Sequence, residues 1–125
     1  MPPARPRVLL VDGEPAVRRV MARVLAARGC DVHPVATGEA AVVAVLHQRF
    51  DVVVSDVTLV GPLNGEALWR TAVGVRPELK NRFVFLTDYV LPLVPGLRLV
   101  TKPFDGLTLW KAVSSVLEGQ AESHR

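Results

Sequence analysis

The chain has 125 residues, half of them hydrophobic, which is enough for one ordinary hydrophobic core and too few for two full domains. Its single cysteine, Cys30, excludes an internal disulfide, and the Lys and Arg residues behind the formal charge of +3 are too scattered to predict a nucleic-acid partner. Because no apolar stretch can span a membrane and no secretory signal opens the chain, we expect a cytoplasmic protein without a membrane partner.

The predicted elements alternate between strands and helices along the chain. Residues 7–11 form an apolar strand, and Pro15 then opens a helix that ends before Gly29. The apolar positions of that helix follow helical spacing: Val17, Val20, Met21, Val24 and Leu25. Its arginines are interpreted as a solvated face: Arg18, Arg19, Arg23 and Arg28. The later elements are predicted as strand 31–35, helix 39–48, strand 52–55, helix 65–75 behind Asn64, strands 83–86 and 97–100, and helix 106–118 behind Asp105.

The pattern of these elements predicts the fold class. Four of the strands are apolar without polar alternation, which is typical of a parallel sheet covered on both faces, and Pro34 marks strand 31–35 as an edge. The alternation indicates a flavodoxin-like α/β fold, a doubly wound five-stranded parallel sheet with helices on both faces. We expect a single domain over residues 1–125, with a core of about 6–118 and loose ends at 1–5 and 119–125.

The segment between the last two strands is short. Residues 88–101 must hold the fifth strand and two loops, and Pro92 and Pro95 lie in the part before the strand. At most about one helical turn can therefore form in this segment. The fourth crossover helix is therefore predicted to be missing or very short.

Polar residues follow the carboxyl ends of the strands, which converge at one edge of a doubly wound sheet. They are Asp12 and Glu14 after the first strand, Asp56 after the third, Thr87 and Asp88 after the fourth, and Lys102 after the fifth. Taken singly, each has a structural interpretation as a loop cap, a strand-end hydroxyl or a solvated charge. Together, two carboxylates, a hydroxyl and an ammonium favour a site for a hard divalent cation and a phosphoryl group.

Four stretches of the chain resemble the response-regulator receiver domains of two-component signalling. They are VLLVDGEPAVRRVM (8–21), VVVSDVTLVGPLNGEAL (52–68), FVFLTDY (83–89) and LVTKPF (99–104), and the resemblance covers essentially the whole chain. The third stretch and RPELK (76–80) are most similar to receivers attached to hybrid sensor kinases. The resemblance implies a domain that is not an enzyme. It also implies that the domain takes a phosphoryl group from a histidine kinase or phosphotransfer protein and signals to a downstream protein that the sequence does not identify.

The resemblance also implies roles for individual residues. Asp56 matches the phosphoacceptor, Thr87 the switch hydroxyl and Lys102 the ammonium that pairs with the phosphoryl group. Asp12, Asp56 and the backbone carbonyl of Thr58 match the ligands of Mg²⁺. The chemistry is consistent, because a carboxylate that attacks phosphorus needs the surrounding negative charge offset by a cation and an ammonium.

The acidic pair after the first strand departs from the family pattern. Receivers usually carry two adjacent acids there, whereas this chain has Gly13 in the second position. Mg²⁺ is commonly bound by only one or two carboxylates, so we expect weak binding or a rearranged shell. Glu14 has two interpretations, as a longer acid that reaches back to the metal or as an acid that meets the dipole of the helix it begins. Asp88 is interpreted as a loop residue or as an extra acid beside the switch hydroxyl.

Two functions therefore stay open. Retention of Asp56, Thr87 and Lys102 favours a phosphoacceptor receiver. Gly13 and the short fourth crossover favour a pseudo-receiver, a protein-interaction module that acts independently of phosphorylation. A flavin- or nucleotide-binding enzyme is disfavoured, because the first strand–helix turn lacks a glycine-rich fingerprint. Leu99 stands where many receivers carry a mobile aromatic ring, so we expect a monomer or a weak dimer.

Overall fold

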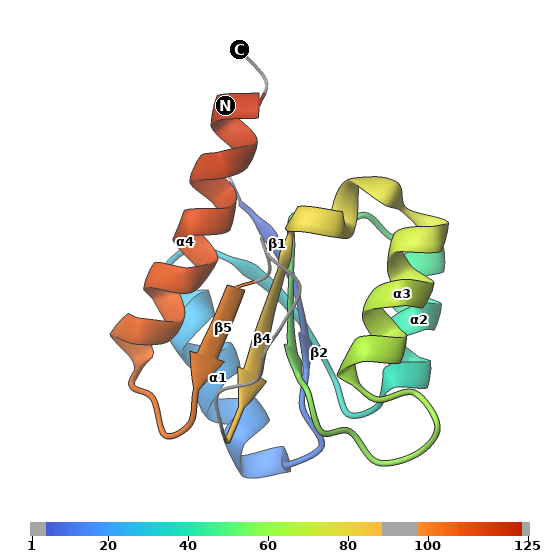
Figure 1. Ribbon diagram of the computed structural model, residues 1–125. Coiled ribbons are helices and arrows are strands. Elements are labelled where there is room, and N and C mark those ends of the chain that lie inside the picture. Colours follow the sequence, from blue (N-terminus) through green and yellow to red (C-terminus); the bar gives the residue numbers. More distant parts are fainter. Residues whose placement is uncertain (1–4, 89–97, 124–125) are drawn as a thin grey trace.

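The computed structural model describes residues 5–88 and 98–123, which form one parallel sheet with helices on both faces (Figure 1). The strands are β1 (Arg7–Val11), β2 (Asp31–Val35), β3 (Val52–Asp56), β4 (Phe83–Thr87) and β5 (Arg98–Thr101). Their order across the sheet is β2-β1-β3-β4-β5. The predicted five-stranded parallel sheet and the edge position of strand 31–35 are both confirmed.

The register of the strands brings the chain to one edge of the sheet at several points. Val11 of β1 lies opposite Ser55 of β3, so the two residues that follow, Asp12 and Asp56, reach the same edge side by side. Thr87 of β4 lies opposite Thr101 of β5, immediately before Lys102. The strand order reverses between β1 and β3, which is where doubly wound sheets place their functional sites.

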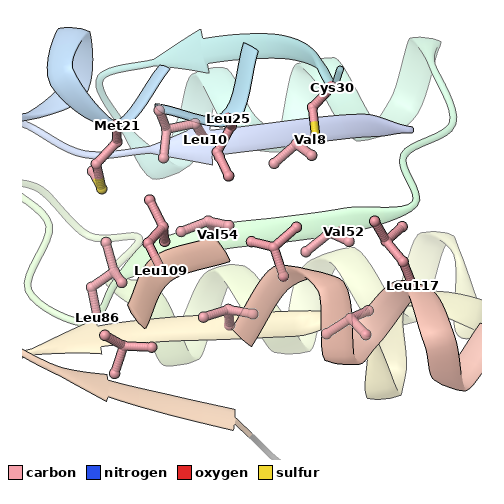
Figure 2. Close-up of a cluster of buried hydrophobic side chains, with 14 residues drawn as sticks. Val8, Leu10, Met21, Leu25, Cys30, Val52, Val54, Leu86, Leu109 and Leu117 are labelled. Carbon is pink, nitrogen blue, oxygen red and sulfur yellow. The ribbon is translucent and has the colours of Figure 1, made fainter. Parts of the chain in front are cut away.

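Four α-helices are found in the described residues: α1 (Pro15–Ala27), α2 (Gly38–His47), α3 (Gly65–Val75) and α4 (Gly106–Ser123). α1 and α4 cover one face of the sheet and α2 and α3 the other (Figure 1). Successive side chains of a strand point to opposite faces, so Val8 and Leu10 of β1 join the α1/α4 core, whereas Leu9 and Val11 join the α2/α3 core. Figure 2 shows the first of these cores.

Local capping explains where several helices begin. Pro15 is the first residue of α1, where its missing N–H costs no helical hydrogen bond. Asn64 caps α3 as predicted, since its side chain accepts a hydrogen bond of 2.9 Å from the N–H of Ala67. Thr37 caps α2 in the same way, with a bond of 3.1 Å to the N–H of Ala40.

Two features of the chain differ from the expectation. α4 continues to Ser123, past the expected end at 118 and into the predicted loose end, because the Gln, Ala and Glu residues after Gly119 are good helix formers. A short 3₁₀ helix, η1 (Pro77–Asn81), joins α3 to β4 and was not predicted. The prediction about the fourth crossover helix falls mainly on residues 89–97, which lie outside the described residues. None of the helices within 5–88 and 98–123 is both long and apolar enough to cross a membrane.

Candidate functional site

An ion-paired cluster occupies the edge of the sheet where β1, β3 and β5 end. Lys102 Nζ lies 2.7 Å from Asp56 Oδ2 and 3.9 Å from Asp12 Oδ2. The backbone positions this lysine, because its N–H donates to the Thr87 carbonyl at 2.7 Å and so extends the β4–β5 pairing by one residue. The structure therefore brings together three of the residues singled out in the sequence.

The Asp56 carboxylate is held by two donors on different elements. Oδ2 accepts from the Lys102 ammonium, and Oδ1 accepts from the N–H of Thr58 at 3.0 Å in the loop after β3. The side chain keeps 13% of its surface exposed, so a group outside the protein can reach it. Asp56 is thus oriented and accessible, as a nucleophile needs to be.

Asp12 is buried beneath this pair. Its side chain has no exposed surface; Oδ1 accepts from the N–H of Glu14 at 2.8 Å, whereas Oδ2 has no hydrogen-bond partner among the described residues. Burial raises the pKa of Asp12 above its ordinary value of 3.8, and the negative charges of Asp56 and Glu14 add to this. The Glu14 N–H and the Lys102 ammonium oppose the rise without cancelling it.

Three carboxylates act on the lysine of the cluster. Desolvation lowers the pKa of Lys102, but the hydrogen bond to Asp56 and the charges of Asp56, Asp12 and Asp88 outweigh it and raise the pKa above 10.5. The ammonium therefore stays protonated at neutral pH. It is a permanent positive charge against the carboxylate of Asp56.

A cavity of about 690 Å³ opens directly onto this cluster. Its polar wall contains Glu14, Asp56, Thr58, Asp88 and Lys102. Its apolar wall comes from α1 and from the turn after Lys102: Ala16, Val17, Val20, Met21, Pro103 and Phe104. Helical spacing placed Val20 on the apolar face of its helix, and the structure shows its side chain 61% exposed at the rim of the cavity.

The structure places the remaining site residues next to the cluster. Thr87 is the last residue of β4 and is 3% exposed, one position before the cavity-lining Asp88. Glu14 occupies the N-cap position of α1, but its side chain makes no capping hydrogen bond. Gly65 begins α3 so close to β3 that an added Cβ would lie 2.7 Å from the Asp56 carbonyl oxygen. The start of α3 therefore packs directly against the backbone of Asp56 and Val57.

The sequence pattern predicted that Arg18 lies on a solvated helix face, but the structure places it at the site. Arg18 is partly buried, and its Nη1 donates to the Asp12 carbonyl oxygen at 2.6 Å. The interpretation was wrong for this arginine because residue 18 lies one turn into α1, where the helix passes over the end of β1. The available signal in the sequence was its position one helical turn after Glu14. In the structure the Arg18 N–H donates to the Glu14 carbonyl oxygen at 2.9 Å.

Comparison with known proteins shows the family of the chain. A family model described as the response regulator receiver domain matches residues 8–113. The chain belongs to that family. The sensor kinase CckA of Brucella abortus (strain 2308) is 34% identical to this receiver domain in an alignment 122 positions long, which covers 90% of this chain and 13% of the kinase. The receiver domain thus spans a small part of that relative's length.

Solved structures agree with the assignment. The receiver domain from the hybrid histidine kinase CckA is 34% identical, with a TM-score of 0.78 over 89% of this chain and 98% of that one. The chemotaxis response regulator CheY4 of Vibrio cholerae is 28% identical, with a TM-score of 0.79 over 90% of this chain and 98% of that one. The resemblance to receivers of hybrid kinases, predicted from the sequence, is confirmed.

Receiver domains generally bind Mg²⁺ at their acidic pocket, and the residues of this one fit a cation. A buried acceptor without a donor is costly, and the unpartnered Oδ2 of Asp12 is such an acceptor. Asp12, Asp56 and the carbonyl of Thr58, the ligands predicted from the sequence, would supply the oxygen atoms that such a cation prefers. No ready-made group of three acidic, histidine or cysteine side chains for a metal is found within the described residues.

Proposed function

We propose that this receiver domain accepts a phosphoryl group on Asp56 from the phosphohistidine of a histidine kinase or phosphotransfer protein. An Asp56 oxygen forms the new bond to phosphorus while the bond from phosphorus to the imidazole nitrogen breaks, and that nitrogen keeps the electron pair. The observation that carries the proposal is the ion pair of 2.7 Å between Lys102 and an accessible Asp56 at the mouth of the cavity.

The residues around Asp56 offset the charge that the transfer concentrates there. Lys102 is held beside Asp56 and stays protonated, so it can bind a phosphoryl oxygen as soon as one arrives. The N–H of Thr58 holds the other carboxylate oxygen and fixes the angle of attack. Mg²⁺, when bound by Asp12, Asp56 and the Thr58 carbonyl, supplies further positive charge to the phosphoryl oxygens.

Phosphorylation then acts as a switch in this proposal. The acyl phosphate adds negative charge and acceptor oxygens beside Lys102, and it gives the Thr87 hydroxyl a new acceptor at the end of β4. If two packings of the domain differ in how well they present these donors, phosphorylation shifts their populations. We propose that an unidentified downstream protein reads this shift, and that the exchange takes place in the cytoplasm. The domain acts here as a signalling module, not as an enzyme.

Intact-mass spectrometry tests the proposal. The protein is incubated with a small phosphodonor and MgCl₂, beside an Asp56→Asn variant and an Asp31→Asn control that removes an exposed acid on β2. We expect a phosphate-sized mass gain in the parent and in the control, and none in Asp56→Asn. A gain that persists in Asp56→Asn would overturn the assignment of the phosphoacceptor.

A phosphorylation-independent interaction module is the second candidate, and Gly13 is the observation that favours it. Without an acid at this position the pocket has one ligand fewer for Mg²⁺ than receivers usually carry. The same experiment separates the two functions. A folded parent that gains no mass at high Mg²⁺ would support the pseudo-receiver.

A further inference from the structure

The acidic pocket has an uncompensated acceptor where Gly13 contributes no side chain. Asp12 Oδ2 is fully buried and has no hydrogen-bond partner among the described residues, because the Lys102 ammonium, with which it forms an ion pair at 3.9 Å, lies beyond hydrogen-bond distance. Lys102 makes its short contact with Asp56 instead. A positively charged ligand beside Asp12 would compensate this oxygen. Receivers with the usual acidic pair have one more carboxylate, at the position of Gly13, to hold such a ligand.

Glu14 is placed to provide that carboxylate. It lines the same cavity as Asp56 and Thr58, and its N–H is bonded to Asp12 Oδ1 at 2.8 Å, so both acids belong to one tight turn. Its side chain is exposed and makes no capping bond to α1. Within residues 5–88 and 98–123 no ion pair or side-chain hydrogen bond engages it. An exposed glutamate without such a bond can change rotamer at little cost.

The charge of the cavity wall favours the same conclusion. Among the cavity-lining residues, Glu14, Asp56 and Asp88 are acidic and Lys102 is the one cation, with the buried Asp12 behind them. A divalent cation offsets this excess of negative charge, and a hard cation selects carboxylate and carbonyl oxygens. We infer that Glu14 turns into the pocket when Mg²⁺ binds and supplies, directly or through a bound water, the carboxylate that Gly13 lacks.

This inference rests on the proposed function only for the identity of the cation, and it can be tested without any phosphodonor. Mg²⁺ is titrated into the unphosphorylated protein by isothermal calorimetry, for the parent and for Glu14→Gln. We expect Glu14→Gln to raise the Kd for Mg²⁺ about tenfold, the loss that follows when a supporting group of a metal site is removed. Glu39→Gln, an acid in the first turn of α2, is the matched control and should change the Kd less than about twofold.

A second background separates a ligand from a general charge effect. Gly13→Asp restores the usual acidic pair, and the backbone accepts it, since a Cβ at Gly13 meets only the Ala36 carbonyl oxygen, at an ordinary contact distance of 3.8 Å. In that background Glu14→Gln should change the Kd less than about twofold, because the introduced aspartate now fills the role. Circular dichroism of each variant checks that the fold is retained.

The outcomes are distinct. An unchanged Kd in Glu14→Gln, an equal loss in both backgrounds, or no Mg²⁺ binding by the parent at millimolar concentrations would overturn the inference. If Glu14 acts only on the dipole at the N-terminus of α1, Glu14→Gln will lower the thermal stability and leave the Kd for Mg²⁺ unchanged. Phosphorylation of Asp56 is measured separately, so a parent that binds Mg²⁺ through Glu14 but gains no phosphate would refute the proposed function alone.

Discussion

Replacement of Gly65 by alanine tests whether the close approach of α3 to β3 positions Asp56. An added Cβ would lie 2.7 Å from the Asp56 carbonyl oxygen and 2.8 Å from Val57 Cα. Both are backbone atoms, so no rotamer change relieves the overlap. Since carbon atoms pack at about 3.5–4.0 Å, Val57 would have to retreat by about 0.7 Å or more, and the loop that carries Asp56 would move with it.

The same substitution at Gly74, near the end of α3, provides a matched comparison. An added Cβ at Gly74 meets no atom within 4 Å. Overpacking of this kind costs about 1–3 kcal/mol, whereas alanine in an open helical position is about 0.5–1 kcal/mol better than glycine. We therefore expect Gly65→Ala to lower the free energy of unfolding and Gly74→Ala to raise it, with a difference between them of about 1.5–4 kcal/mol.

Urea denaturation followed by the fluorescence of Trp69, in α3, measures both variants against the parent. A time course of Asp56 phosphorylation with a small phosphodonor gives the functional readout. Gly65→Ala should slow the reaction several-fold because Asp56 is displaced, and Gly74→Ala should leave it unchanged. A Gly65→Ala protein as stable as the parent and phosphorylated at the parental rate would refute the reasoning.

Asp12→Asn should raise the free energy of unfolding by about 1–2 kcal/mol, because it removes a buried negative charge that desolvation and the charges of Asp56 and Glu14 disfavour. The difference in stability between Asp12→Asn and the parent should shrink when Mg²⁺ binds and stabilises the parent. A urea midpoint of Asp12→Asn equal to or below that of the parent, measured without Mg²⁺, would contradict the prediction. Hydrogen bonds from the Thr108 N–H and hydroxyl hold the pKa of Asp105 below 3.8, so the stability from this group is present above that value and is lost as the pH falls through the lower folded pKa. Below about pH 4, the free energy of unfolding should therefore fall less steeply with decreasing pH in Asp105→Asn than in the parent. Equal slopes in the two proteins would contradict this role of the Asp105–Thr108 hydrogen bonds. Lys102→Met removes the ammonium 2.7 Å from Asp56 and should slow phosphorylation about a hundredfold by intact-mass time course, whereas a parental rate would exclude the proposed role.

Residues close together in the chain were predicted well because their structure depends on local periodicity and caps. The helix behind Asn64 has the predicted bounds, and the strand that contains Pro34 lies at the edge of the sheet. The end of α4 was predicted too early because Gly119 alone does not stop a helix whose neighbours are good helix formers. Arg18 was assigned to solvent because helical periodicity shows which residues share a face but not what passes beneath that face.

The sequence by itself determined the parallel sheet, the family and the short list of residues at the strand ends. It could do so because apolar runs, turn residues and motif spacing act between neighbours in the chain. Only the tertiary structure decided which charges are compensated, because Lys102 and Asp56 are 46 positions apart and meet through the packing of β3, β4 and β5. That packing pairs Lys102 with Asp56, buries Asp12 with one oxygen unpartnered, and places Glu14 at the cavity with no capping bond to hold it.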